Sequence, residues 1–110
     1  MAHYLFRFTF TAETVKAMLA NPKDRREPAG RIFAAHGGKM LHYFWMMGEY
    51  DGMAICDFAD AKGAAAVSMT VASSGAFGRF ETTPLLTMEE VLAAMELSRK
   101  SGGSYVPPGR

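Results

Sequence analysis

The residues best suited to chemistry lie in one stretch, positions 42–58, which reads HYFWMMGEYDGMAICDF. His42 stands in an apolar run, and apolar surroundings keep a histidine neutral and usable as a base near pH 7. Tyr50 or Arg7 could then stabilise a negative charge that develops on a substrate. This trio would suit an enzyme that works without a cofactor, with His42 as the base.

The same residues also have a structural interpretation. His42 could be a core or interface histidine with a single hydrogen-bond partner. Gly48, Tyr50 and Asp51 could form a turn, because Asp bonds nearby backbone N–H groups and Gly adopts unusual φ values. The ring of Tyr50 would pack over the hairpin while its hydroxyl stays in water. The sequence favours this role, in which the polar tip fixes the register of an apolar hairpin. The alternative is the rim of a ligand pocket.

A second group of residues could bind a small molecule without transforming it. Its members are aromatic or charged and lie on or near the same strands: Trp45, Phe44, Asp51, Asp57, Arg79 and His36. Arg7 and Asp57 alternate onto one predicted face, where a buried charge needs a partner. An Arg7–Asp57 pair at a subunit contact is the simpler expectation. The alternative is a polar cluster in an aromatic-lined cavity for an anionic or aromatic ligand. His36, in the last turn of a predicted helix, is more simply a capping residue.

No spacing in the sequence indicates a metal or a cofactor. HExxH, CxxC and His pairs at i, i+4 are missing, as are the glycine-rich phosphate loops. Cys56 is the only cysteine, so no disulfide can form within the chain. The nine methionines are soft donors, but methionine more often fills gaps in a core. We therefore predict no metal site and no cofactor.

Composition restricts the class of protein. The 110 residues are 49% hydrophobic and 21% charged, which is typical of one globular domain. The net charge of +1 gives no electrostatic reason to expect binding to nucleic acid or to an anionic membrane. No apolar run approaches the ~18 residues of a membrane span, and no secretory signal is apparent. We expect a cytoplasmic protein.

Hydrophobic periodicity predicts four strands and four helices. Strands are expected at residues 3–10, 39–47, 53–58 and 79–86, and helices at residues 12–20, 24–36, 61–73 and 88–100. Thr11 and Asp60 are expected to cap helices. Capping boxes are expected for Asp24 with Glu27 and for Thr87 with Glu90. Pro84 places the last strand at a sheet edge or its end.

This order is the βαββαβ, ferredoxin-like plan of an α+β fold, followed by an extra C-terminal helix. Both central helices would cover one face of a four-stranded antiparallel sheet. The open face would carry Leu5 and one face of the apolar hairpin, which should not remain in water. A second copy packed sheet to sheet would solve this, giving a homodimer with a dimeric α+β barrel. We expect a domain at residues 1–98 and a flexible tail at residues 99–110.

The segment YFWMMGEYDGMA at residues 43–54 resembles the GYD-domain family. Trp45, Gly48, Tyr50 and Asp51 match the Trp-x-x-Gly-x-Tyr-Asp pattern at its second hairpin. Gly37-Gly38-Lys39 and the alanine-rich helix also fit, over roughly residues 3–92. The resemblance implies a ferredoxin-like domain related to dimeric α+β barrel proteins. It brings no established substrate, cofactor or catalytic residue.

Three functions therefore stay open. The first is a homo-oligomeric module that binds an apolar or aromatic small molecule, either between the sheet and its helices or between two subunits. The second is a cofactor-independent monooxygenase, isomerase or cyclase of the barrel type, with His42 as the base. The third is a purely structural assembly unit. Roles found in larger barrel relatives reach this chain by fold analogy only.

Overall fold

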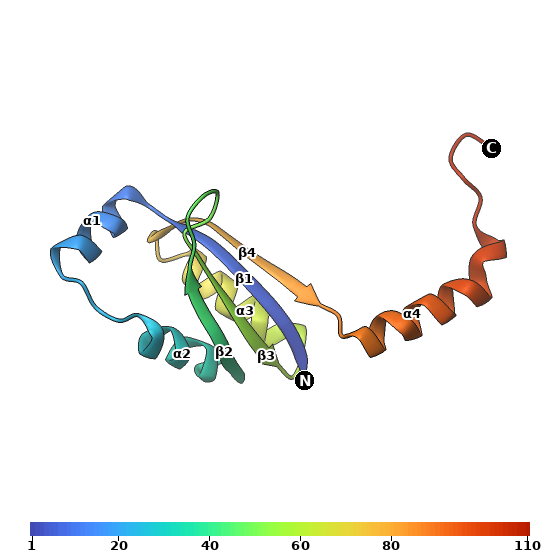
Figure 1. The fold of residues 1–110 in the computed structure, drawn as a ribbon, viewed down its shortest axis with the longest axis horizontal. Helices are drawn as coiled ribbons and strands as arrows, with labels where there is room; N and C mark the ends of the chain where they lie inside the picture. The colour runs from blue at the N-terminus through green and yellow to red at the C-terminus, as the bar shows by residue number, and fades with distance from the viewer.

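The computed structural model describes residues 1–110 and contains one antiparallel sheet with strand order β2-β3-β1-β4 (Figure 1). The strands are β1 (Ala2–Phe10), β2 (Gly38–Trp45), β3 (Gly52–Phe58) and β4 (Phe77–Leu85). Two helices of the βαβ units lie on one face, α2 against β2 and α3 against β4. The predicted ferredoxin-like α+β fold is confirmed. Pro84 lies on an edge strand, as expected.

The helices begin largely where their capping residues predict. They are α1 (Ala12–Ala20), α2 (Arg26–Ala35), α3 (Ala61–Ala72) and α4 (Met88–Ser101), with a short 3-10 helix η1 (Gly102–Ser104). Thr11 and Asp60 cap α1 and α3, and Thr87 forms the expected capping box with Glu90. The capping box predicted for Asp24 is wrong. Arg25 is the N-cap of α2, and the Asp24 carboxylate instead accepts the Arg26 N–H at 2.9 Å.

The core lies between the sheet and its two covering helices. The alternation in β1 turns Tyr4, Phe6 and Phe8 toward the helices, where all three are buried. The ring of Phe6 lies 5.0 Å from that of Phe33 in α2 and 6.2 Å from that of Phe58 in β3. Such tilted aromatic contacts add to the free energy gained by burying the rings. They fix which face of β1 points inward.

A bulge in β2 changes the faces that a simple alternation assigns. Met40 pairs with Cys56 and His42 pairs with Ile55, so the register shifts between them. Met40 therefore lies against the core, whereas His42 and Phe44 lie on the open face. Strict alternation would put these three residues on one face, but one extra residue in a bulge reverses it.

The helix α4 projects away from the rest of the molecule (Figure 1). Two residues separate it from the end of β4, and none of its own residues is buried. The Cα radius of gyration is 17.9 Å, against about 13 Å for a compact chain of this length. Residues 99–101 complete α4 and residues 102–104 form η1, so the division into a domain and a flexible tail stays a prediction. No helix has the length and apolar character needed to cross a membrane.

Candidate functional site

The hairpin between β2 and β3 is fastened to β1 through Asp51. Its carboxylate Oδ2 accepts the backbone N–H of Phe10 at 2.8 Å, and its own N–H donates to the carbonyl of Phe8 at 2.9 Å. Its carbonyl accepts the N–H of Met46 at 2.8 Å, which closes the turn. Gly48 has a φ of 131°, which favours glycine. The Gly-x-Tyr-Asp segment therefore sets the hairpin on β1. The Asp51 carboxylate bonds this distant strand, and not the nearby N–H groups that the structural interpretation expected.

Tyr50 folds over the open face of the sheet and is only 9% exposed. Its hydroxyl donates to Glu81 Oε1 at 2.8 Å, and Arg7 Nη2 donates to the same oxygen at 3.1 Å. The guanidinium carbons of Arg7 and Arg79 lie 4.4 Å and 4.8 Å from the centre of the Tyr50 ring. Cations at this distance from an aromatic ring are attracted to its face. The ring is thus held by two cations and one carboxylate.

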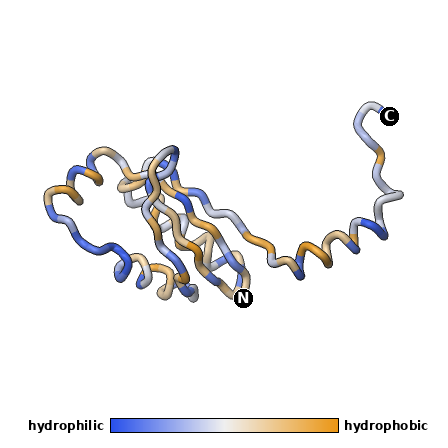
Figure 2. Tube along the Cα trace, in the orientation of Figure 1, coloured by the Kyte–Doolittle hydropathy of each residue, from blue (hydrophilic) through white to orange (hydrophobic).

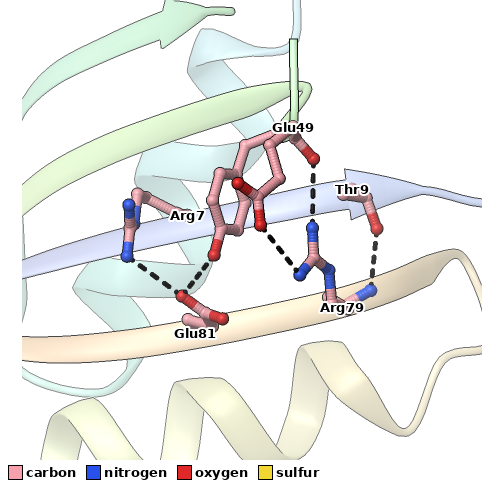
Figure 3. A network of polar contacts seen from close by, with 6 residues as sticks. Arg7, Thr9, Glu49, Arg79 and Glu81 are labelled. Atoms are coloured by element: carbon pink, nitrogen blue, oxygen red, sulfur yellow. Dashed lines mark hydrogen bonds and ion pairs between the residues drawn. The ribbon is translucent and has the colours of Figure 1, made fainter.

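Arg79 extends this network to the hairpin tip (Figure 3). Its guanidinium donates to the backbone carbonyl of Glu49 at 3.1 Å and contacts the Glu49 carboxylate at 3.5 Å. Its backbone N–H donates to the hydroxyl of Thr9 at 2.8 Å. The network therefore joins β1, β4 and the β2–β3 hairpin across the sheet.

The electrostatics of the network keep Tyr50 protonated. The hydrogen bond to Glu81, and then removal from water, raise the pKa of Tyr50. A phenol of this kind donates a hydrogen bond near neutral pH and does not act as a base. The expectation that its hydroxyl stays in water is wrong, because Glu81 is directly within reach. Sequence reasoning missed Glu81, although its alternation with Arg79 on the fourth strand was visible.

The predicted Arg7–Asp57 pair does not form. Arg7 stands opposite Glu81 in the β1–β4 register and pairs with it. Asp57 stands opposite His3 in the β1–β3 register and contacts its imidazole. The faces were predicted correctly, but the residue that lies directly across a strand depends on the register, which the sequence does not display.

His42 stands apart from Arg7 and Tyr50. It is exposed on β2, and its ring stacks on that of Phe44 with centroids 6.0 Å apart. Strand β3 separates it from β1, which places the two strands roughly 10 Å apart. The structure thus assembles Tyr50 and Arg7 but not the full trio of predicted catalytic residues. His36 is the C-cap of α2, and its Nδ1 lies 2.9 Å from the carbonyl of Ile32.

Trp45 points to the helix-covered side, near a hollow that sequence reasoning missed. Its ring lies 5.2 Å from that of Phe10, which in turn lies 5.0 Å from Phe77. Phe10 and Phe77 form part of the wall of a hollow of about 630 Å³. Helix α1, the segment 21–25 and the α3–β4 connection complete it, contributing Ala17, Met18, Lys23, Arg25 and Gly75 among others. Aromatic residues at the ends of two neighbouring strands were the signal available in the sequence.

Some of the charged residues at this hollow have an ion-pair partner and others have none. Lys23 and Arg25 line it and form no ion pair within the chain. Asp24 also lines it but is held by Arg26, with a contact of 2.6 Å between Oδ2 and Nη2. The hydrogen bonds from Arg26 lower the pKa of Asp24 to about 2. Glu13, in the first turn of α1, is the acidic group opposing the two free cations.

The remaining reactive side chains form neither a metal site nor a reactive thiol. No three His, Cys, Asp or Glu side chains gather as a metal site would require. Cys56 is buried in the core, and burial followed by the nearby Asp57 charge raises its pKa to about 12. A thiol in this state is a poor nucleophile near neutral pH.

The fold and hairpin define a ferredoxin-like α+β domain with a Gly-x-Tyr-Asp turn. The model of the GYD domain family matches residues 4–95, and the chain belongs to this family. A comparison with curated proteins found no match.

Two solved structures resemble the chain. One is the crystal structure of FFRP-DM1, with 13% identity and a TM-score of 0.49 over 78% of this chain and all of that chain. The other is protein Atu4242 from Agrobacterium tumefaciens, also with 13% identity and a TM-score of 0.49, over 78% of this chain and 92% of that chain. Likeness at this level carries no argument about activity.

Proposed function

We propose that this GYD-domain protein is a homo-oligomeric module that binds an apolar or aromatic small molecule. The observation that carries the proposal is the hollow beside α1, whose volume of about 630 Å³ is within the range of ligand pockets. It lies at the end of the sheet, between α1, the segment 21–25 and the α3–β4 connection.

The lining of the hollow supports a ligand with an apolar or aromatic body. The rings of Phe10 and Phe77 offer flat surfaces for stacking, and Met18 adapts readily to different shapes. Lys23 and Arg25 add positive charge, which favours a ligand carrying an acidic group.

The exposed surface of the single chain supports assembly. The chain exposes 7741 Å², whereas a compact monomer of 12.0 kDa exposes about 6,000 Å². The excess exceeds the ~800 Å² that one partner buries in a standard interface. The open face also carries Leu5, Phe44, Met53 and Ile55, which no helix covers. We propose that a second copy covers this face, as in dimeric α+β barrels.

The alternative enzymatic function gains no support from a specific contact. His42 has no hydrogen bond to orient it, and the Tyr50 hydroxyl is committed to Glu81. A purely structural role leaves the hollow unexplained. A cytoplasmic location stays a prediction.

The binding proposal can be tested with an aromatic anion, 8-anilinonaphthalene-1-sulfonate, as the probe. Trp45 is the only tryptophan and contacts Phe10, so quenching of its fluorescence should report binding in the hollow. The substitution Ala17→Phe puts a ring into the hollow, whereas Ala20→Phe on the same helix lies outside its lining. We expect Ala17→Phe to weaken binding by about tenfold, the effect of a ~1.4 kcal/mol loss. Equal binding by both variants would show that the hollow is not the site.

A further inference from the structure

Helix α4 carries an apolar stripe that nothing in its own chain covers. Met88, Val91, Leu92 and Met95 recur at spacings of three and four and therefore share one face. Leu92 is 56% exposed, although such a stripe normally packs against a core. Figure 2 shows hydrophobic residues concentrated where α4 leaves the sheet. A helix of 14 residues is marginal in water without tertiary packing.

The body of the molecule has an apolar groove that nothing fills. It lies between α3 and the edge strand β4, with a volume of about 440 Å³. Ala61, Ala65 and Met69 of α3 line one side at spacings of four, and Phe80 and Pro84 of β4 line the other. Met69 is 71% exposed there. The groove lies on the helix-covered side, so it is separate from the open sheet face.

The stripe and the groove match in chemistry, because both are lined mainly by apolar side chains. Alanines on α3 allow another helix to approach closely, and the larger Met and Leu side chains of α4 would fill the space they leave. An amphipathic helix laid in an apolar groove is a common recognition mode. Docking would also remove part of the excess exposed surface described above.

The connection between β4 and α4 indicates whether α4 docks in the groove of its own chain or in that of a second copy. Leu86 is the single residue between the last residue of β4 and the N-cap Thr87. The capping box holds the first turn of α4, with Thr87 N–H donating to Glu90 at 3.0 Å and Glu90 N–H donating to Thr87 at 3.2 Å. This junction directs α4 away from its own body, along the longest dimension of 60 Å (Figure 1). A short hinge that keeps an element off its own body favours exchange between copies.

We infer that α4 is an exchanged arm, whose stripe docks in the α3–β4 groove of a second copy. The inference rests on the homo-oligomer of the proposed function and names the surfaces that hold it together. It adds a helix–groove contact to the sheet contact proposed above.

Two matched pairs of variants test the two surfaces by sedimentation of the full chain. Leu92→Glu charges the stripe, whereas Leu97→Glu makes the same change on the opposite side of α4, where Leu97 is 70% exposed. Met69→Glu charges the groove, whereas Thr70→Glu charges an exposed neighbour outside it. We expect Leu92→Glu and Met69→Glu each to raise the dissociation constant at least about tenfold. The two controls should leave it unchanged.

Mixing distinguishes exchange from folding back. A Leu92→Glu chain keeps an unaltered groove, and a Met69→Glu chain keeps an unaltered α4 stripe. A mixture of the two should therefore form mixed oligomers, in which α4 of the Met69→Glu chain docks in the groove of the Leu92→Glu chain. If α4 docked in the groove of its own chain, the mixture would associate no more tightly than either variant alone. That result would overturn the inference. Unchanged assembly of Leu92→Glu would overturn it as well.

The test separates this inference from the proposed function. An oligomer that forms equally well with either charged variant would leave the proposed assembly standing and remove the arm from it. A wild-type chain that stays monomeric would remove both. Binding of the aromatic anion to the hollow is measured independently, because none of the four substituted residues lines it.

Discussion

At the scale of single residues, Tyr50 shows how a residue suited to catalysis can serve a structural purpose. Its ring lies between the guanidinium groups of Arg7 and Arg79, and its hydroxyl donates to Glu81. The sequence offered Tyr50 as a candidate catalytic residue together with His42 and Arg7. It could not show that Glu81 contacts Tyr50, because the two meet only through the order of strands in the sheet.

The pH dependence of stability should report this bond. The hydrogen bond to Glu81 favours the protonated phenol and raises the folded-state pKa of Tyr50 above its unfolded value of about 10. The stability it contributes is complete below that value and is lost as the pH rises through the folded-state pKa.

Tyr50→Phe should therefore be less stable than wild type at pH 7, with a difference that shrinks above about pH 10. Urea unfolding midpoints at pH 7, 9 and 11 would measure this. A difference that grows with alkaline pH would contradict the assignment. The other tyrosines are present in both proteins, so their contributions to the pH dependence of stability cancel in the comparison.

At the scale of elements, the hairpin is positioned by Asp51. Its carboxylate is the partner of the Phe10 N–H at the point where β1 changes register against β4. Asp51→Ala would leave that backbone donor without its acceptor, a loss of about 1–3 kcal/mol in the free energy of unfolding.

Glu49→Ala at the same tip is the matched control. Glu49 is exposed and meets Arg79 at 3.5 Å, and exposed pairs contribute about 0–1 kcal/mol. Chemical denaturation of the two variants and wild type would measure both effects. Equal losses would show that Asp51 has no special role in holding the hairpin.

Local patterns predicted the elements better than the contacts between them. Thr11, Asp60 and Thr87 marked helix starts correctly because capping depends on residues within one turn. The bulge after Met40 and the pairing of Arg7 depend on register, which is decided between strands far apart in sequence. The hollow beside α1 was missed for the same reason, since its wall combines three distant segments.

At the scale of the whole molecule, the chain exposes more surface than a compact domain of its mass. The sequence predicted an uncovered apolar sheet face, because period-two alternation reveals which side a strand buries. It did not predict the projecting arm, because helix propensity says nothing about the direction in which a helix leaves a strand. The open sheet face, the groove and the stripe together make a single copy incomplete as an independent unit.

The most direct test of this account is native mass spectrometry of the freshly purified full chain, first at low and then at raised collision energy. It reports the number of subunits and any retained small molecule together. We predict a dimer or larger oligomer that carries an additional non-covalent mass, released at higher energy. An empty monomer would contradict both the proposed assembly and the proposed binding function.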